Sequence, residues 1–204
     1  MDTRQKPDER RYHHGDLRAA LLRAAEEELT LAGVEGFSLR AVAKRAGVSH
    51  AAPAHHFGDV TGLLTALCAE GFRRFLAAQA AREAVAAADP RSQIIAAGLG
   101  YIDFAISAPA LFRLMFSSAK PDRASHELAE VAGAAYRHLL EQVAAAGGTV
   151  AKDGTPTLDV AAAWAAAHGL ADLIASRPMK GVADMPKDQR DRFLAGIIDR
   201  ALPR

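Results

Sequence analysis

The chain has 204 residues, and its 25 lysines and arginines are balanced by 24 aspartates and glutamates, so its formal net charge is +1. Half of the residues are hydrophobic, alanine is abundant, and no run of β-branched and aromatic residues alternates with polar ones. This composition excludes a predominantly β fold and favours close-packed helices. The single cysteine, Cys68, excludes an intrachain disulfide framework, suits a reducing cytoplasm and is expected to be a small core residue.

The first residues, 1–14, are charged and lack an apolar run, so we do not interpret them as a signal peptide and expect a cytoplasmic protein. They are expected either to form a basic arm that binds DNA phosphates or to be a solvated chain end. The basic residues of this segment are Arg4, Lys6, Arg10 and Arg11.

Apolar spacing, capping residues and prolines predict helices along the whole remaining chain. Five prolines stand at or near the first position of a predicted helix, where a missing N–H costs least. The segments 147–155 and 178–184 are interpreted as loops because of their glycine, proline and polar content. Helices are predicted over residues 15–33, 38–45, 49–55, 59–87, 90–107, 109–118, 122–147, 156–176 and 186–201.

The most informative stretch is SLRAVAKRAGVSHAAPAHHFGDVTGLL, residues 38–64. Ser38 can cap a short helix by accepting a backbone N–H, and Gly47 lies where the chain must turn, a position that often needs a positive φ. Ser49 is expected to cap a second short helix with small and polar side chains. Two short helices joined by a glycine-containing turn are typical of a helix-turn-helix, which places its second helix in the DNA major groove.

This region resembles the DNA-binding domain of the TetR (tetracycline repressor) family of bacterial transcriptional regulators. The resemblance starts in YHHGDLRAALLRAAEEELTLAG, residues 12–33, continues through SLRAVAKRAGVS and reaches His56-Phe57, which is followed by Asp59 and Leu63-Leu64. Over the rest of the chain the resemblance is weaker but continuous. Trp164 and His168-Gly169 in WAAAHGLADL resemble a subgroup whose C-terminal domain is named for a Trp-His-Gly signature.

The resemblance implies an all-α fold with two domains. Residues 1–58 would form a three-helix DNA-binding domain, preceded by the basic arm. A long helix would join it to residues 59–204, a helical bundle for ligand binding and dimerisation. The implied function is that of a ligand-responsive homodimeric repressor that binds a palindromic operator in double-stranded DNA and responds to a small-molecule effector.

Two residues depart from the family pattern. Ala54 stands where the family usually has tyrosine, and Val60 stands where it usually has lysine; both of those residues commonly touch DNA phosphates. These departures leave open the alternative of a helical ligand-binding protein with lost or altered DNA recognition.

The residues expected to contact DNA lie on the two short helices. Arg40 and His50 are candidates for reaching base edges, whereas Ser49, His55 and His56 are better suited to hold phosphates, which position a protein without reading sequence. Histidines next to phosphates are favoured in their charged form. The complete set is Ser38, Arg40, Lys44, Ser49, His50, His55 and His56.

The histidines also raise the alternative of a metal sensor or metal-dependent enzyme. Adjacent residues on a helix point about 100° apart, so His55 and His56 do not easily share a metal. His50 and His55 miss the i, i+4 spacing of zinc-binding helices. The sequence contains no second cysteine, HExxH pattern, glycine-rich phosphate loop or nucleophile elbow. We therefore expect no metal, no cofactor and no catalysis.

Two segments of the second half carry stripes at helical spacing that are suited to helix pairing. Both stripes could instead pack within one subunit. A helix-turn-helix protein that reads a palindrome needs two-fold symmetry, however, and this favours pairing of the stripes in a homodimer. The apolar stretch 160–175 is interrupted by His168 and Asp172, so no membrane partner is expected. The stripes consist of Leu158, Ala161, Ala162, Ala165 and Gly169, and of Phe193, Leu194, Ile197, Ile198 and Ala201.

An effector pocket is expected around the aromatic segment YIDFAISAPALFRLMF. Small-molecule sites are mostly apolar with a few polar groups, although aromatic residues at helical spacing also form ordinary cores. Taken alone, His168 is better explained as a buried, hydrogen-bonded side chain than as a ligand contact. The expected lining consists of Tyr101, Phe104, Phe112, Met115, Phe116, Trp164 and His168.

Overall fold

The computed structural model describes residues 14–176 and 178–203, without the side chains of residues 14–16 and 180. The described part consists of helices joined by turns and loops and contains no strand, which confirms the all-α fold. The expected basic arm and His13 lie outside the described residues. The helices are α1 (His14–Ala32), α2 (Leu39–Ala46), α3 (Ala52–Phe57), α4 (Val60–Glu83), α5 (Pro90–Ser107), α6 (Pro109–Ser117), α7 (His126–Ala145), α8 (Leu158–Ala175), α9 (Lys180–Ala183) and α10 (Lys187–Ala201).

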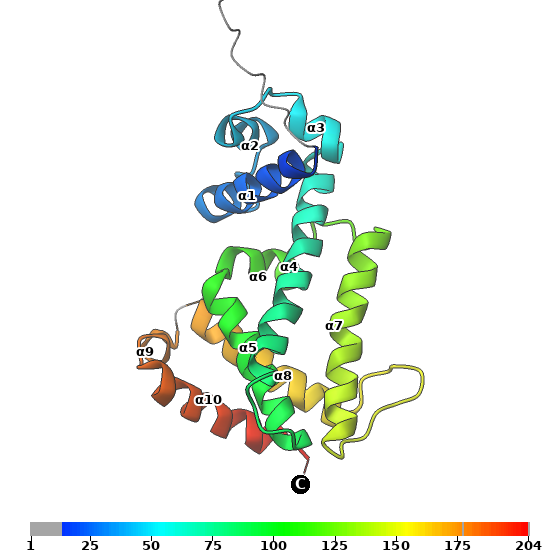
Figure 1. Ribbon diagram of the computed structural model, residues 1–204, viewed down its shortest axis with the longest axis vertical. Helices are drawn as coiled ribbons and strands as arrows, with labels where there is room; N and C mark the ends of the chain where they lie inside the picture. Colours follow the sequence, from blue (N-terminus) through cyan, green and yellow to red (C-terminus); the bar gives the residue numbers. More distant parts are fainter. Residues whose placement is uncertain (1–13, 177, 204) are drawn as a thin grey trace, which may run out of the picture.

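Helices α1, α2 and α3 gather at one end of the molecule (Figure 1). Leu21 of α1 and Val42 of α2 are fully buried in the core between them. As the sequence predicts, Ser38 caps α2, because its hydroxyl oxygen accepts the N–H of Ala41 at 3.2 Å. Gly47 ends α2 with φ at 69°, in the left-handed region that favours glycine. This pair of caps sets the tight turn of the helix-turn-helix.

Helix α3 begins later than the sequence predicts, and Ser49 is not its N-cap. The helix starts at Ala52, whose N–H is accepted by the backbone carbonyl of Ser49 at 3.0 Å. The physical reason is Pro53. A helix capped by Ser49 would need a Pro53 N–H to bond the Ser49 carbonyl, whereas a helix that starts at Ala52 places the proline in its first turn, where no N–H is required.

Helix α4 runs from the helix-turn-helix end to the opposite end of the molecule (Figure 1). Asp59 caps it by accepting the N–H of Gly62 at 2.8 Å. The sequence predicts that it continues to residue 87, but it ends at Glu83. Beyond that point the bonds tighten, as between the N–H of Ala86 and the carbonyl of Glu83, and this three-residue spacing ends an α-helix.

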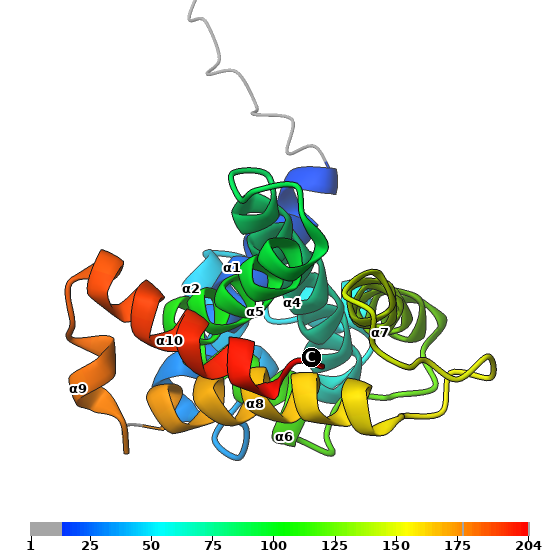
Figure 2. The ribbon, with the colours of Figure 1, turned by 90° about the horizontal axis from the view of Figure 1, so that it is seen from below.

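Helices α5, α6 and α7 pack against the remainder of α4, whereas α8 and α10 pack against α5 and each other, and α9 contacts α8 (Figures 1 and 2). Helix α7 begins at His126, four positions after its predicted start. The segment 178–184, predicted as a loop, contains the short helix α9. There the carbonyl of Met179 accepts the N–H of Val182, and Val182 is buried. A helix this short is too brief to show apolar periodicity in the sequence.

One hydrophobic core extends from α1 to α10 and joins both ends of the molecule. Gly100 allows α4 and α5 to approach closely, because a Cβ there would lie 2.5 Å from the Cα of Gln79. Cys68 is fully buried in this core. Burial raises the pKa of its thiol to about 11, so the thiol stays protonated and unreactive. Cys68 is therefore a core residue, as the sequence suggests.

Candidate functional site

The outer surface of α2, α3 and the turn between them carries most of the side chains expected to contact DNA. Arg40, Lys44, Ser49, His50 and His55 are exposed. Within the described residues, neither Arg40 nor Lys44 takes part in an ion pair. Both cations therefore remain available to an anionic partner.

Ser38 and His56 differ from the other candidates because both are half-buried. The Ser38 hydroxyl oxygen is already used in the cap of α2. The His56 ring lies between those of His55 and Phe57, with centroid distances of 5.6 and 6.2 Å. In the part of the chain that the structure describes, no three His, Cys, Asp or Glu side chains form a cluster that could hold a metal ion.

A third cation of α2, Arg45, is turned toward the protein instead. Its Nη2 lies 3.0 Å from Oε2 of Glu28 and its Nη1 lies 3.6 Å from Oε2 of Glu27, both on α1. Glu28 is only 7% exposed, so this guanidinium is the partner of an almost buried carboxylate. Arg45 therefore fixes α2 against α1, while Lys44 stays on the surface.

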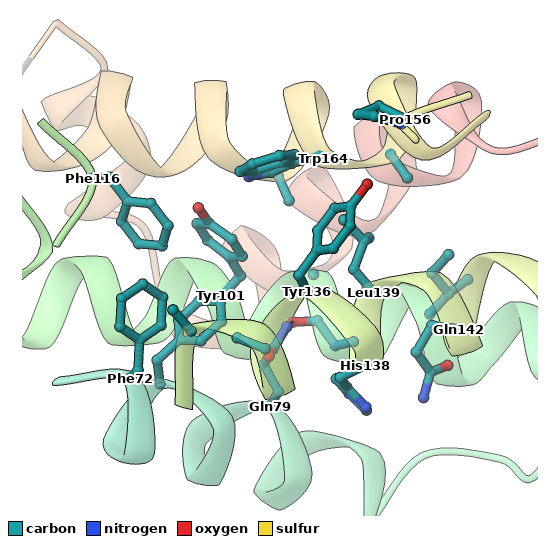
Figure 3. A pocket seen from close by; sticks show the side chains of 18 of the residues that line it. Phe72, Gln79, Tyr101, Phe116, Tyr136, His138, Leu139, Gln142, Pro156 and Trp164 are labelled. Carbon is teal, nitrogen blue, oxygen red and sulfur yellow. Dashed lines mark hydrogen bonds between the residues drawn. The ribbon is translucent and has the colours of Figure 1, made fainter. Parts of the chain in front are cut away.

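Besides the helix-turn-helix surface, the structure has a cavity of about 610 Å³ inside the C-terminal bundle. Helices α4, α5, α7, α8 and α10 contribute to its walls. Phe72, Tyr101 and Phe116 lie at one end, and Gln142 and Pro156 lie at the other (Figure 3). Its size falls in the usual range for small-molecule sites, and its lining is mostly apolar.

The structure places four of the seven expected pocket residues in the cavity wall: Tyr101, Met115, Phe116 and Trp164. The other three, Phe104, Phe112 and His168, are outside the lining and pack behind it. Nδ1 of His168 lies 2.8 Å from the Tyr101 hydroxyl. Burial raises the pKa of this hydroxyl above its ordinary range, so the group stays protonated and shares a hydrogen bond with Nδ1. His168 therefore orients Tyr101 from outside the cavity.

The sequence interpretation missed the contribution of α7, which forms much of one wall. Ala132, Tyr136 and Leu139 recur at intervals of four and three and face the cavity. Two polar neighbours, His138 and Gln142, both bind Oε1 of Glu83 on α4, at 2.8 and 2.9 Å. The apolar spacing on α7 was visible in the sequence, but nothing there showed that this face meets a cavity. The missed lining residues include Phe72, Phe75, Gln79, Ala132, Ala135, Tyr136, His138, Leu139 and Gln142.

The segment between α6 and α7 connects the cavity with the helix-turn-helix end. Arg123 lines the cavity, and the adjacent Asp122 donates its backbone N–H to Oγ1 of Thr65 on α4 at 2.8 Å. Lys120 of the same segment lies 3.4 Å from Glu35, between α1 and α2.

Glu127, in the first turn of α7, makes a second connection. Its carboxylate pairs with Arg73 of α4 at 2.7 Å and with Arg18 of α1 at 3.5 Å. The Arg18 guanidinium also lies 5.5 Å from the ring centroid of Phe57, the last residue of α3. A chain of contacts therefore runs from a cavity-lining helix to the second helix of the helix-turn-helix.

These features define a helical protein with a helix-turn-helix at one end and a cavity-containing bundle at the other. Two family models match it: bacterial regulatory proteins of the tetR family over residues 21–67, and a tetracyclin repressor-like C-terminal domain over residues 94–201. Because the second model alone covers more than half of the chain, the protein belongs to the TetR family.

Among curated proteins, the chain is similar to the HTH-type transcriptional regulator BetI of Burkholderia ambifaria, with 37% identity over 95 residues. The match covers 46% of this chain and 49% of the relative, so the chain matches about half the length of this curated relative. Among solved structures, a Rhodococcus sp. RHA1 protein of unknown function is 32% identical, with a TM-score of 0.74 over 96% of this chain and all of that one.

PfmR, a TetR family transcriptional regulator from Thermus thermophilus, is 23% identical, with a TM-score of 0.63 over 90% of this chain and 99% of that one. At this identity the likeness shows the shared fold.

Proposed function

We propose that the protein is a ligand-responsive, homodimeric transcriptional repressor that binds a palindromic operator. The observation that carries the proposal is the combination of a helix-turn-helix with exposed, unpaired cations and a separate apolar cavity joined to it by contacts. Arg40 and His50 read base edges, and Lys44, Ser49 and His55 contact phosphates. Ser38 and His56 position the two helices and have less surface to offer DNA.

The domain division proposed from the sequence, 1–58 and 59–204, places the boundary just before α4. Asp59 caps α4 at this point, which supports a helical start independent of α3. The Trp-His-Gly subgroup is likewise a proposal. Its support is that Trp164 lines the cavity and that His168 holds the hydroxyl of Tyr101, another lining residue.

The outer face of α8 supports a two-fold dimer. Its stripe of Leu158, Ala161, Ala162 and Ala165 is exposed, and Leu158 reaches 90% exposure. A Cβ built on Gly169 would meet nothing within 4 Å, which leaves room for a second helix. α8 is also long and apolar enough to cross a membrane, but it packs against α5, α7 and α10, and we propose a cytoplasmic protein without a membrane partner.

The α10 stripe proposed for the same interface divides into two sets. Leu194 and Ile198 are buried within the subunit, so they are not available to a partner. Phe193 is 44% exposed, and Ile197 and Ala201 are half-buried, so these three residues of the stripe can pair with the partner's α10. The proposed interface is therefore narrower on α10 than the sequence suggests.

The proposed mechanism is a coupling free energy between the cavity and the operator. In the ligand-free dimer the two α3 helices lie about one DNA turn apart, roughly 34–36 Å. A ligand that shifts α7 or the segment 118–125 changes the contact of Glu127 with Arg18 and that of Asp122 with Thr65 on α4. The resulting change in spacing lowers operator affinity.

A gel shift with DNA from upstream of the protein's own gene tests the proposal, with scrambled duplex as competitor. We expect selective binding to a palindromic segment by a dimer, with the dimer mass established by sedimentation. Equal affinity for scrambled DNA would favour the alternative of a helical ligand-binding protein with lost DNA recognition, which Ala54 and Val60 keep open.

A further inference from the structure

The charge of the cavity wall is unbalanced. One guanidinium, that of Arg123, belongs to the lining, whereas no aspartate or glutamate does among the described residues. Taking an anion out of water is costly unless the site supplies a compensating charge. A single guanidinium in a mostly apolar wall without an acidic side chain therefore favours a ligand that has one anionic group on an apolar body.

Arg123 keeps donors for such a group. Its Nη2 donates to the backbone carbonyls of Met115, at 2.7 Å, and Ser118, at 3.1 Å. Within residues 14–176 and 178–203, no hydrogen bond is made by its Nε or Nη1, and no carboxylate pairs with it. The two carbonyl bonds hold the guanidinium beside Met115, at the aromatic end of the cavity. Three N–H groups are left for charge-assisted bonds to a carboxylate.

Two polar side chains at the other end of the cavity are already hydrogen-bonded within the protein. Glu83 lies behind the wall and accepts hydrogen bonds from Gln142 and His138. Figure 3 shows His138 and Gln142 at the end opposite Phe72 and Phe116. Between the ends the wall is aromatic and aliphatic apart from the uncharged Gln79, which suits a body with no charge of its own. The cavity volume, about 610 Å³, exceeds the needs of a small polar acid.

We propose that the effector is an amphipathic carboxylic acid. Its carboxylate binds Arg123, and its apolar body extends past Tyr101 and Trp164 toward Leu139. This inference rests on the proposed function, because it takes the cavity to be the effector site.

The same geometry indicates how such a ligand acts on the DNA-binding end. A carboxylate bound at the free Nε and Nη1 of Arg123 draws the guanidinium toward the cavity, and with it the carbonyls of Met115 and Ser118 that Nη2 holds. The neighbouring Asp122 is bonded to Thr65 of α4, so a displacement of Arg123 is passed to the helix that supports α3.

The test uses three probes with the same ten-carbon chain: decanoate, 1-decanol and decyltrimethylammonium. Binding to the full-length protein is measured by calorimetry and by the fluorescence of Trp164, the only tryptophan, which lines the cavity. We expect decanoate to bind at least tenfold more tightly than either other probe. Arg123→Gln should remove this preference while leaving 1-decanol binding unchanged, and Arg123→Lys should retain part of it because the charge is kept.

The matched control is Arg113→Gln, an exposed arginine of α6 outside the cavity wall, which should keep the wild-type preference. Similar affinities for the three probes, tighter binding of the cationic probe, or no binding of any probe would overturn the proposal. The same holds if Arg123→Gln and Arg113→Gln behave alike. Operator binding without ligand is measured separately, so a protein that binds its operator but prefers none of these probes remains a DNA-binding regulator with another effector.

Discussion

At the scale of single residues, neighbouring cations of α2 have different roles. Arg45 is the partner of the nearly buried Glu28, whereas Lys44 is exposed without an ion-pair partner among the described residues. Arg45→Ala should lower the free energy of unfolding by about 1–3 kcal/mol, because a buried carboxylate loses its charged donor. Lys44→Ala is the matched control and should change stability by less than about 0.5 kcal/mol. Urea unfolding of both variants measures this, and equal stabilities would contradict the structural role of Arg45.

Arg40 and His50 are the residues proposed to read bases. Arg40→Ala and His50→Ala should each cost about 1–3 kcal/mol of operator binding and relax selectivity at one base position. Lys44→Ala should instead weaken binding similarly on all duplexes and reduce the salt dependence. Competition gel shifts with single-base operator variants make the comparison. Unchanged selectivity in both alanine variants would assign base reading to other residues.

At the scale of elements, the turn between α2 and α3 depends on the backbone of Gly47. Its φ of 69° is strained for any residue with a Cβ, although a Cβ there would meet no atom within 4 Å. Gly47→Ala should therefore destabilise the protein by about 1–2 kcal/mol through backbone strain alone. Gly47→Asn should cost less, because asparagine tolerates this region. Thermal unfolding that shows no difference between alanine and asparagine would argue against strain at this position.

In and near the helix-turn-helix, some helix ends could be predicted from the sequence and others could not. Ser38 and Gly47 could be assigned as caps because each acts within a few residues of its own position. The start of α3 was misplaced because the proline constraint at Pro53 outweighs the capping preference of Ser49. Helix α9 was missed because four residues are too few to show apolar periodicity. A cap that acts alone was therefore predictable, whereas competing local preferences and a very short helix were not.

The cavity was also predictable in part. Aromatic residues of α5 and α6 stand out in the sequence, and Tyr101 and Phe116 do line the cavity. Phe112 is an aromatic residue of the same segment, but it is fully buried behind the cavity wall. The position of the helix on the other side of the cavity, here α7, decides which face of an aromatic helix lines the cavity. The periodicity of the sequence does not contain this information.

An ion-pair network joins the ends of α4, α5 and α10. Arg82 binds Asp103 and Asp191, and Lys187 also binds Asp191 at 2.8 Å. Burial alone would raise the pKa of Asp191, but the hydrogen bonds and charges of Arg82 and Lys187 outweigh it and lower the pKa below its ordinary range. A lowered pKa contributes stability above the unfolded-state value, about 3.9, and this contribution is lost as pH falls through the folded-state value.

Stability against acid should therefore depend on Asp191. Between about pH 5 and pH 3 the free energy of unfolding should fall more steeply for wild type than for Asp191→Asn. At pH 7 the variant should be the less stable protein, because Arg82 loses a charged partner. Asp188→Asn is the control on the same helix, since its side chain is 70% exposed and, among the residues that the structure describes, pairs only with Arg192. If the free energy of unfolding changes with pH in the same way for wild type and Asp191→Asn, this network does not contribute to the acid response.

At the scale of the whole molecule, the orientation of the helix-turn-helix relative to the bundle is set by a few side chains in addition to α4. Glu127 bridges Arg18 and Arg73, and Arg18 lies over Phe57. All three charged side chains are 42% exposed, so each pair contributes at most about 1 kcal/mol. Ion pairs of this strength can favour one orientation of the helix-turn-helix relative to the bundle without determining the fold. A ligand-controlled change of orientation requires such weak contacts.

Glu127→Gln should therefore leave the fold intact and loosen the spacing between the two α3 helices of the dimer. Wild type should discriminate against operators whose half-sites are moved apart by one base pair, because a rigid dimer fits one separation. The variant should show up to about fivefold less discrimination, corresponding to the loss of about 1 kcal/mol of orientation energy. Glu130→Gln, on an exposed position of the same helix, is the control and should discriminate as wild type does. Gel shifts with the two operator spacings, supported by circular dichroism of each variant, measure the effect. If Glu127→Gln and Glu130→Gln keep the same spacing preference, the orientation is set by the α4 core alone and the bridge has no part in transmitting the signal.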